Sequence, residues 1–186
     1  MKRMATLLLL FGICFTQIDA QRERTLFNGG GDIELTGVWG GSTNALVDFN
    51  NNFNLNSGGF FAFEINNSFL IGWSGYKSDI TDGGNDIKIN GNDLFLGYTF
   101  RSENIIHPLI YLQTGSGKLE VEDIGTDRVF VAQPTFGVEA NIARFFRLGI
   151  DGGYRFFSGN DLPGLEDNDF AGPVLNLRLK FGWSWD

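Results

Sequence analysis

The feature that most constrains the fold is a strict alternation of apolar and polar residues, which is clearest over residues 172–185. Successive side chains of a β-strand point to opposite faces, so this pattern predicts a strand with one apolar and one polar face. The apolar face would carry Leu175, Leu177, Leu179, Phe181, Trp183 and Trp185, and the polar face Asn176, Arg178, Lys180, Gly182 and Ser184. Strands of this kind form a sheet whose two faces meet different surroundings.

Comparable patterns recur along the chain and predict eight strands in all. We expect them at residues 31–40, 58–66, 68–76, 93–101, 107–115, 129–140, 145–157 and 172–185. No segment shows a sustained helical period, and none beyond the N-terminus is apolar for long enough to form a membrane-spanning helix. The 26 glycines, 19 phenylalanines and only 2 methionines are typical of sheets with tight bends. The sequence therefore predicts an all-β protein.

The predicted connections between these strands alternate between long and short. Residues 41–57, 77–92, 116–128 and 158–171 form the long connections, and 66–67, 101–106 and 141–144 form the short ones. In an up-and-down barrel, alternate connections lie at opposite ends, so all four long loops would lie at one end. Transmembrane β-barrels have this asymmetry. We therefore predict an eight-stranded antiparallel up-and-down transmembrane β-barrel.

The charge of the chain limits its partners. It carries 22 acidic and 14 basic residues, a formal net charge of −8, which argues against nucleic-acid binding. The acidic surplus lies in the long connections, which are therefore candidates for contact with an extracellular ligand, although solvated polar loops would look the same. These connections lack the ligand spacing of a calcium loop, so we predict no metal site and no cofactor.

Aromatic residues gather toward the ends of the predicted strands, where the interfaces of a membrane would lie. The set that we assign to these interfaces is Trp39, Phe61, Phe100, Phe146, Phe156, Trp183 and Trp185. Their positions favour a barrel whose apolar face meets lipid. A secreted, lipocalin-like barrel that binds a ligand is the alternative, because it would also alternate and because Gly37 and Trp39 match a G-x-W motif.

The polar faces of the predicted strands carry charges that would point into the barrel. These candidate luminal residues are Glu34, Glu64, Glu139, Arg147, Arg178 and Lys180. An eight-stranded barrel is just wide enough for side chains to fill its interior. Charges in that space must pair, because an isolated buried charge is costly. We therefore predict a luminal salt-bridge network that closes the barrel to free diffusion, with a channel for small solutes as the alternative.

Residues 1–20 have the layout of a secretory signal peptide. Lys2 and Arg3 precede a short apolar core, and Ala20 offers a small residue for cleavage before Gln21. The predicted domains are thus a removed signal peptide at 1–20 and a barrel domain at 21–186, exported by a Sec-type route. The single cysteine, Cys14, would leave with the signal peptide.

Residues 134–156 read PTFGVEANIARFFRLGIDGGYRF. This segment resembles the sixth strand, tight turn and seventh strand of the small eight-stranded outer-membrane barrels of the OmpA/OmpX and opacity-protein kind. The terminal strand is similar to that family's assembly signal, although it ends in Trp185 and Asp186 instead of a phenylalanine. The resemblance implies a place in the outer membrane of a Gram-negative envelope, recognition by the barrel assembly machinery, and contact with outer-membrane lipid and lipopolysaccharide.

Enzymes that modify outer-membrane lipid also use this scaffold, and they need a base beside a nucleophile near the outer leaflet. The only histidine, His107, precedes Pro108 on the short-turn side, which is the wrong end for that lipid, and we expect it in a turn. We therefore predict a protein without catalytic residues. Its expected role is structural in the envelope or in surface contact, with a lipid-modifying enzyme as the alternative.

Overall fold

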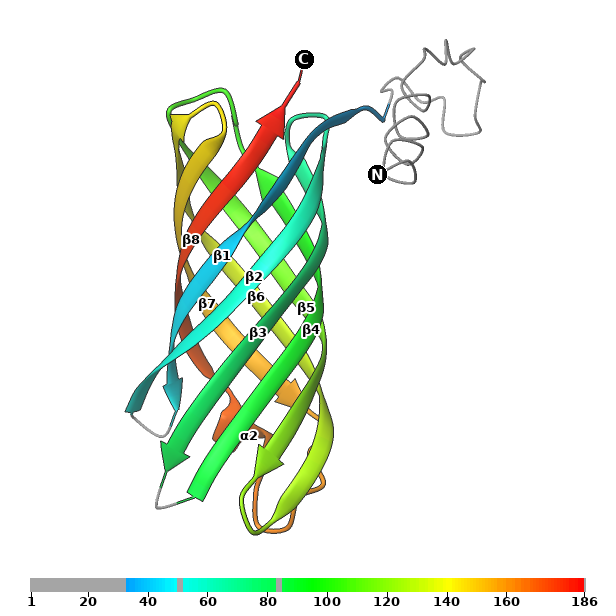
Figure 1. The fold of residues 1–186 in the computed structure, drawn as a ribbon, viewed down its shortest axis with the longest axis vertical. Coiled ribbons are helices and arrows are strands. Elements are labelled where there is room, and N and C mark those ends of the chain that lie inside the picture. Colours follow the sequence, from blue (N-terminus) through cyan, green and yellow to red (C-terminus); the bar gives the residue numbers. More distant parts are fainter. Residues whose placement is uncertain (1–32, 50–51, 83–84, 186) are drawn as a thin grey trace, which may run out of the picture. The chain divides into compact units, whose positions relative to one another are not determined.

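In the computed structural model, eight strands form a closed antiparallel barrel (Figure 1). The structure describes residues 33–49, 52–82 and 85–185, so the predicted signal peptide lies outside the described residues. The strands are β1 (Leu35–Phe49), β2 (Asn52–Ile65), β3 (Phe69–Asp82), β4 (Asn85–Thr99), β5 (Ile106–Val121), β6 (Gly125–Ala143), β7 (Phe146–Ser158) and β8 (Gly172–Ser184). Each strand pairs with its neighbours in sequence, and β8 pairs with β1. The predicted all-β class, strand number and up-and-down order are confirmed.

The strands extend well beyond their predicted ends at one end of the barrel, which we call the hairpin end. Residues 50–51 separate β1 from β2, 83–84 separate β3 from β4, and 122–124 separate β5 from β6. The prediction of four long loops is therefore wrong. Strand pairing is made by backbone hydrogen bonds, so polar segments rich in asparagine can continue a strand where apolar patterning would end it.

One long connection does lie at the hairpin end. Residues 159–171 join β7 to β8 and contain the short helix α2 (Asp167–Phe170). The connection is tied to the neighbouring hairpin, because the backbone N–H of Asp161 donates to the Asp127 carboxylate over 2.6 Å. Among the described residues, no helix has the length and apolar character needed to cross a membrane.

The other end, here the short-turn end, carries the connections 66–68, 100–105 and 144–145. Asn66 and Asn67 have φ angles of 51° and 54°, a left-handed conformation that asparagine tolerates better than most residues. The side-chain oxygen of Asn66 accepts a hydrogen bond from the backbone N–H of Glu34, over 2.8 Å. This bond ties the β2–β3 turn to the residue that precedes β1.

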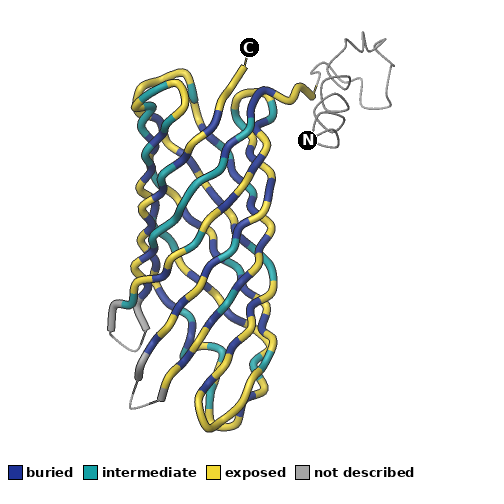
Figure 2. The backbone as a smooth tube through the Cα atoms, in the orientation of Figure 1, coloured by how far each residue is buried: buried dark blue, intermediate teal, exposed yellow. Residues whose placement is uncertain are grey.

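The two faces of β3, β4 and β5 exchange their polarity along the length of the barrel. From the short-turn end to about the middle, large apolar side chains face outward, and the lumen holds charged side chains beside a buried apolar cluster around Phe95. We call these outward residues, together with Phe130 farther along β6, the apolar belt: Leu35, Phe61, Phe63, Phe69, Ile71, Trp73, Leu94, Ile106, Ile110, Leu112, Phe130, Phe136, Val138, Ile150, Leu177, Phe181 and Trp183. Toward the hairpin end, β3, β4 and β5 turn apolar residues inward and polar residues outward. Figure 2 shows the alternation of buried and exposed positions along the strands.

An irregularity near the start of β1 changes which of its side chains face the lumen. The pairing of β1 with β2 shifts register between Leu35 and Gly37. A bulge adds one residue to one strand and so reverses the alternation beyond it. Leu35 is exposed, whereas Trp39 faces the lumen and is only 1% exposed.

Candidate functional site

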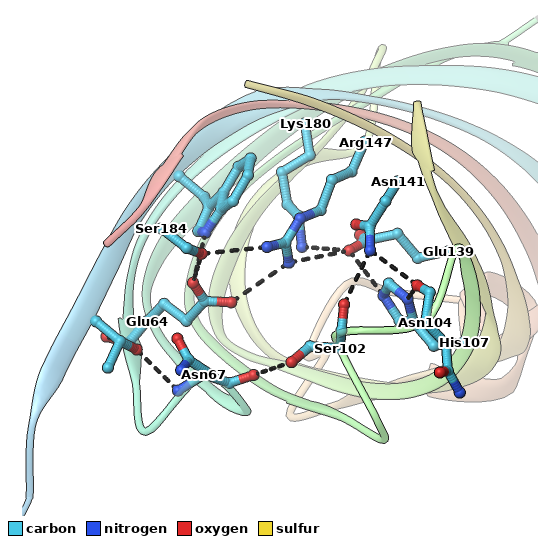
Figure 3. A network of polar contacts seen from close by, with 12 residues as sticks. Glu64, Asn67, Ser102, Asn104, His107, Glu139, Asn141, Arg147, Lys180 and Ser184 are labelled. Carbon is cyan, nitrogen blue, oxygen red and sulfur yellow. Dashed lines mark hydrogen bonds and ion pairs between the residues drawn. The ribbon is translucent and has the colours of Figure 1, made fainter. Parts of the chain in front are cut away.

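The lumen near the short-turn end holds a cluster of charged side chains around Glu139 of β6 (Figure 3). The Glu139 carboxylate lies 2.7 Å from Nζ of Lys180, 3.3 Å from Nε2 of His107 and 3.6 Å from Nη1 of Arg147. Arg147 also reaches Glu64 of β2, over 3.3 Å, so the network crosses the lumen. All five side chains are buried. We call this group of Glu64, His107, Glu139, Arg147 and Lys180 the ionic plug.

Neighbouring aromatic and hydroxyl groups complete the bonding of the ionic plug. The indole N–H of Trp39 donates to Glu64 over 3.0 Å, and the Arg147 guanidinium lies 4.0 Å from the centre of the Trp39 ring. The Ser184 hydroxyl donates to the same Glu64 carboxylate. These contacts matter because a buried carboxylate is stable only when its oxygens have partners.

A second polar layer lies between the ionic plug and the hairpin end. Arg178 of β8 contacts Asp151 of β7 through two hydrogen bonds, with Nε–Oδ2 at 2.6 Å and Nη2–Oδ1 at 3.2 Å. This two-bond geometry is among the strongest that side chains form. The side-chain amide of Asn176 donates to Asp151 over 2.6 Å, and Arg178 donates to Gln113 over 3.2 Å. The layer therefore joins β5, β7 and β8 across the lumen.

A third layer is centred on Arg155 of β7. Its Nε donates to Gln133 over 2.6 Å, and its guanidinium lies 4.3 Å from the centre of the Tyr76 ring. Gln133 in turn donates to Gln113 of the second layer over 3.1 Å. Among the described residues the buried charges are balanced, with Glu64, Asp93, Glu139 and Asp151 against Arg147, Arg155, Arg178 and Lys180.

Beyond the third layer the interior becomes apolar. The buried residues of this region, which we call the apolar cap, are Tyr76, Ile80, Ile87, Ile89, Leu119, Val121, Val129, Val131, Phe157, Leu162 and Phe170. Leu162 and Phe170 come from the 159–171 connection, and the Phe170 ring packs against Phe157 with the ring centres 6.0 Å apart. This connection therefore contributes two of its side chains to an apolar core at the hairpin end.

Most of the predicted luminal charges do lie in the lumen, namely Glu64, Glu139, Arg147, Arg178 and Lys180. Glu34 does not, and its prediction is wrong. It is exposed because β1 begins only at Leu35, which leaves Glu34 beyond the mouth of the barrel. The network also contains Asp93, Asp151 and Arg155, which were not predicted to belong to it. The alternation of β7 already placed Asp151 and Arg155 on the face of Arg147, so this signal was available.

His107 also differs from its prediction. It lies within β5 and is fully buried, not in a turn. Its Nδ1 is 3.0 Å from the backbone oxygen of Asn104, and its Nε2 faces Glu139, so both ring nitrogens are engaged inside the lumen. Within the described part of the chain, no group of three or more His, Cys, Asp or Glu side chains is arranged to hold a metal ion.

The aromatic residues assigned to membrane interfaces lie mainly on the outer surface. Phe61, Phe100, Phe156, Trp183 and Trp185 are exposed, and Phe146 is half-buried and stacks on Phe181 with ring centres 4.8 Å apart. Trp39 is the exception, and its assignment is wrong because the bulge in β1 turns it inward. Whether the outward set lies at membrane interfaces stays a prediction.

A closed eight-stranded antiparallel barrel with an apolar outer belt and a charged lumen is the fold of the small outer-membrane β-barrels, and comparison with solved structures bears this out. Neisserial surface protein A superposes with a TM-score of 0.59 and 12% identity, over 81% of this chain and 99% of that one. The N-terminal β-barrel domain of Pseudomonas aeruginosa OprF superposes with a TM-score of 0.55 and 10% identity, over 80% and 98% of the two chains. No protein family profile and no curated protein sequence matches the chain.

Proposed function

We propose that the protein is an integral outer-membrane barrel with a closed lumen and a non-catalytic role in the envelope or in surface contact. The observation that carries this proposal is the apolar belt, to which all eight strands contribute. Trp183, for example, is 65% exposed on the outside, whereas Lys180 and Glu139 are sealed within. An exposed apolar surface that encircles a protein marks contact with lipid, because water would disfavour it.

The orientation follows from the two ends of the barrel. Outer-membrane barrels turn their short connections toward the periplasm. The short-turn end would therefore face the periplasm, and the hairpin end with the 159–171 connection would face outward. In this orientation the acidic residues near the hairpin tips are available to an extracellular ligand. Export by a Sec-type signal at 1–20 and insertion by the barrel assembly machinery belong to the same proposal.

A closed lumen is supported by the three polar layers and the apolar cap. The side chains of these layers bond to one another across the lumen, and the apolar cap lies between them and the described part of the hairpin end. The internal hollow beside Tyr76 and Arg155 has a volume of about 10 Å³, which is room for roughly one water molecule. Ligand pockets are far larger, at about 300–1,000 Å³, so the filled interior also argues against a lipocalin-like ligand-binding barrel.

The membrane part of the proposal is tested by fractionation of cells that express the chain, followed by electrophoresis of heated and unheated samples. A folded membrane barrel should sediment with outer membranes and migrate differently before and after boiling. Release by osmotic shock as a soluble protein would instead support the secreted barrel. Planar-bilayer recording tests the closed lumen, because the purified protein should give no large, stable ion conductance.

The non-catalytic part needs a separate test. We expect mass spectrometry of lipid A to give the same species from cells with and without the protein. His107 supports this expectation, since it is buried within the lumen near the short-turn end and both its nitrogens are engaged. A new deacylated or acylated species that depends on the protein would replace the structural role with that of a lipid-modifying enzyme.

A further inference from the structure

The outward surface of β3–β6 carries a row of polar residues between the apolar belt and the hairpin tips. Lys77 pairs with Asn90, Asn90 pairs with Lys118, and Lys118 pairs with Arg128. Directly paired residues on one face of a sheet have Cβ atoms about 5 Å apart. The four side chains therefore form one continuous row that crosses four strands, and we call it the cationic rim.

The cationic rim lies just beyond the apolar belt. Lys77 follows Trp73 by four residues along β3, and Arg128 is two residues from the exposed Phe130 on β6. Four residues of a strand span about 13 Å, and the tilt of barrel strands reduces this to about 10 Å along the barrel axis. That distance corresponds to the headgroup region of a membrane, and long lysine and arginine side chains can reach toward it from either side.

The cationic rim is positively charged, and negative charges appear only in the rows farther from the apolar belt. The rim contains no carboxylate, and the next row outward is mixed, with Asp79 paired to Lys88 and Lys88 paired to Glu120. Glu122 and Asp123 lie farther out still, at the β5–β6 hairpin tip. Positive charge is thus nearest to the belt and negative charge farthest from it. A membrane surface that carries anionic groups fits this order.

The contacts of the rim leave its cations accessible. Lys118 and Arg128 line an open hollow on the outer surface together with Asn90 and Ser116. Lys118 makes a 3.0 Å ion pair with Glu120, but both side chains are about half exposed, and exposed pairs of this kind are weak. The carboxylate of Asp127, beside Arg128, accepts hydrogen bonds from the backbone N–H groups of Arg128 and Asp161.

From this arrangement we propose that Lys77, Asn90, Lys118 and Arg128 form a binding site for the phosphate groups of outer-leaflet lipid headgroups. The inference rests on the proposed function, because it needs the barrel to sit in a bilayer with the hairpin end outward. The ammonium and guanidinium groups bind phosphate oxygens through charge-assisted hydrogen bonds. The side-chain amide of Asn90 supplies a further donor between the cations. The site would fix lipid on the β3–β6 side of the barrel.

The test measures lipid bound to the folded barrel in nonionic detergent micelles that contain bis-phosphorylated lipid A. Each interfacial cation strengthens binding to an anionic lipid by about fivefold, so replacing three should weaken it on the order of a hundredfold. We expect this loss in Lys77→Gln/Lys118→Gln/Arg128→Gln. The control Arg101→Gln/Arg144→Gln removes two exposed cations from the short-turn end and should bind as the parent does.

Further binding measurements test whether the lipid phosphate is the ligand and whether removing a neighbouring negative charge strengthens binding. Glu120→Gln frees Lys118 and should raise lipid A binding severalfold. Dephosphorylated lipid A should bind poorly, and millimolar inorganic phosphate should compete weakly. Equal binding of the two lipid A forms, unchanged binding by the triple variant, or full displacement by inorganic phosphate would each overturn the proposal.

A final control separates this inference from the proposed function. All variants are first folded into phosphatidylcholine vesicles and checked by their shift in electrophoretic mobility on heating. Failure of the parent protein to insert would contradict the membrane barrel itself. Insertion without a preference for phosphorylated lipid A would contradict only the cationic rim.

Discussion

Glu139 is the carboxylate on which the ionic plug converges, and replacing it by glutamine tests whether that network holds the barrel together. The side chain is 1% exposed and faces Lys180, His107 and Arg147. In Glu139→Gln, Lys180 would lose the only ion pair that it makes among the described residues and remain buried. Breaking a buried pair from one side costs about 3–5 kcal/mol, which is a large part of a typical stability of about 5–15 kcal/mol.

The free energy of unfolding can be measured by urea titration of the barrel in phospholipid vesicles, followed by tryptophan fluorescence. The double variant Glu139→Gln/Lys180→Met should recover most of the loss, because it removes both charges and leaves the Arg147–Glu64 pair intact. The control Glu120→Gln breaks an exposed pair and should cost less than about 1 kcal/mol. The reasoning is refuted if Glu139→Gln costs no more than this control. It is also refuted if the losses of Glu139→Gln and of Lys180→Met, each measured alone, simply add in the double variant.

Three further predictions concern packing and orientation. Gly72→Val should prevent folding, because a Cβ at residue 72 would lie 1.9 Å from the backbone oxygen of Phe61, and the protein should then migrate identically with and without boiling. In the control Gly40→Val the nearest atom to the new Cβ is 3.5 Å away, so this variant should fold. Phe170→Ala should lower the free energy of unfolding by about 3–5 kcal/mol, since it removes a buried ring from the apolar cap; a change below 1 kcal/mol in urea titrations would contradict the cap. In variants that keep one tryptophan, brominated phosphatidylcholine should quench the fluorescence of Trp183 but not that of Trp39, and the opposite result would reverse the barrel's inside and outside.

The sequence contained enough information for the strand number and order, because the alternation of apolar and polar residues is a local property of each strand. The polar face of β8 shows this, since Arg178 and Lys180 were assigned to the lumen from their spacing alone and both are buried there. Glu64 and Glu139 were assigned to the lumen from the same alternation, and both are buried there. The predicted strand ends were less accurate, because polar residues such as Lys118 and Glu120 occupy the outward face where β5 continues beyond the belt.

Two residue assignments were wrong for the same physical reason: the alternation of apolar and polar residues does not show where a strand begins or where its pairing register shifts. Glu34 was assigned to the lumen on the assumption that the first strand begins near residue 31, but β1 begins at Leu35. Trp39 was assigned to the outer surface, but the register shift after Leu35 turns it inward. A one-residue bulge hardly changes the sequence pattern, yet it exchanges the inward and outward faces of the rest of its strand.

By itself, the sequence determined that this chain forms eight paired strands, with apolar side chains outside and charged side chains inside from the short-turn end to about the middle of the barrel. Only the tertiary structure decided which charges meet, since Arg147 and Glu64 are 83 residues apart and Arg178 and Gln113 are 65 apart. It also decided that the polarity of β3, β4 and β5 reverses toward the hairpin end, where the 159–171 connection supplies Phe170 to an apolar core. The reason is that a strand's pattern fixes two faces, whereas barrel closure and register choose the neighbours of each face.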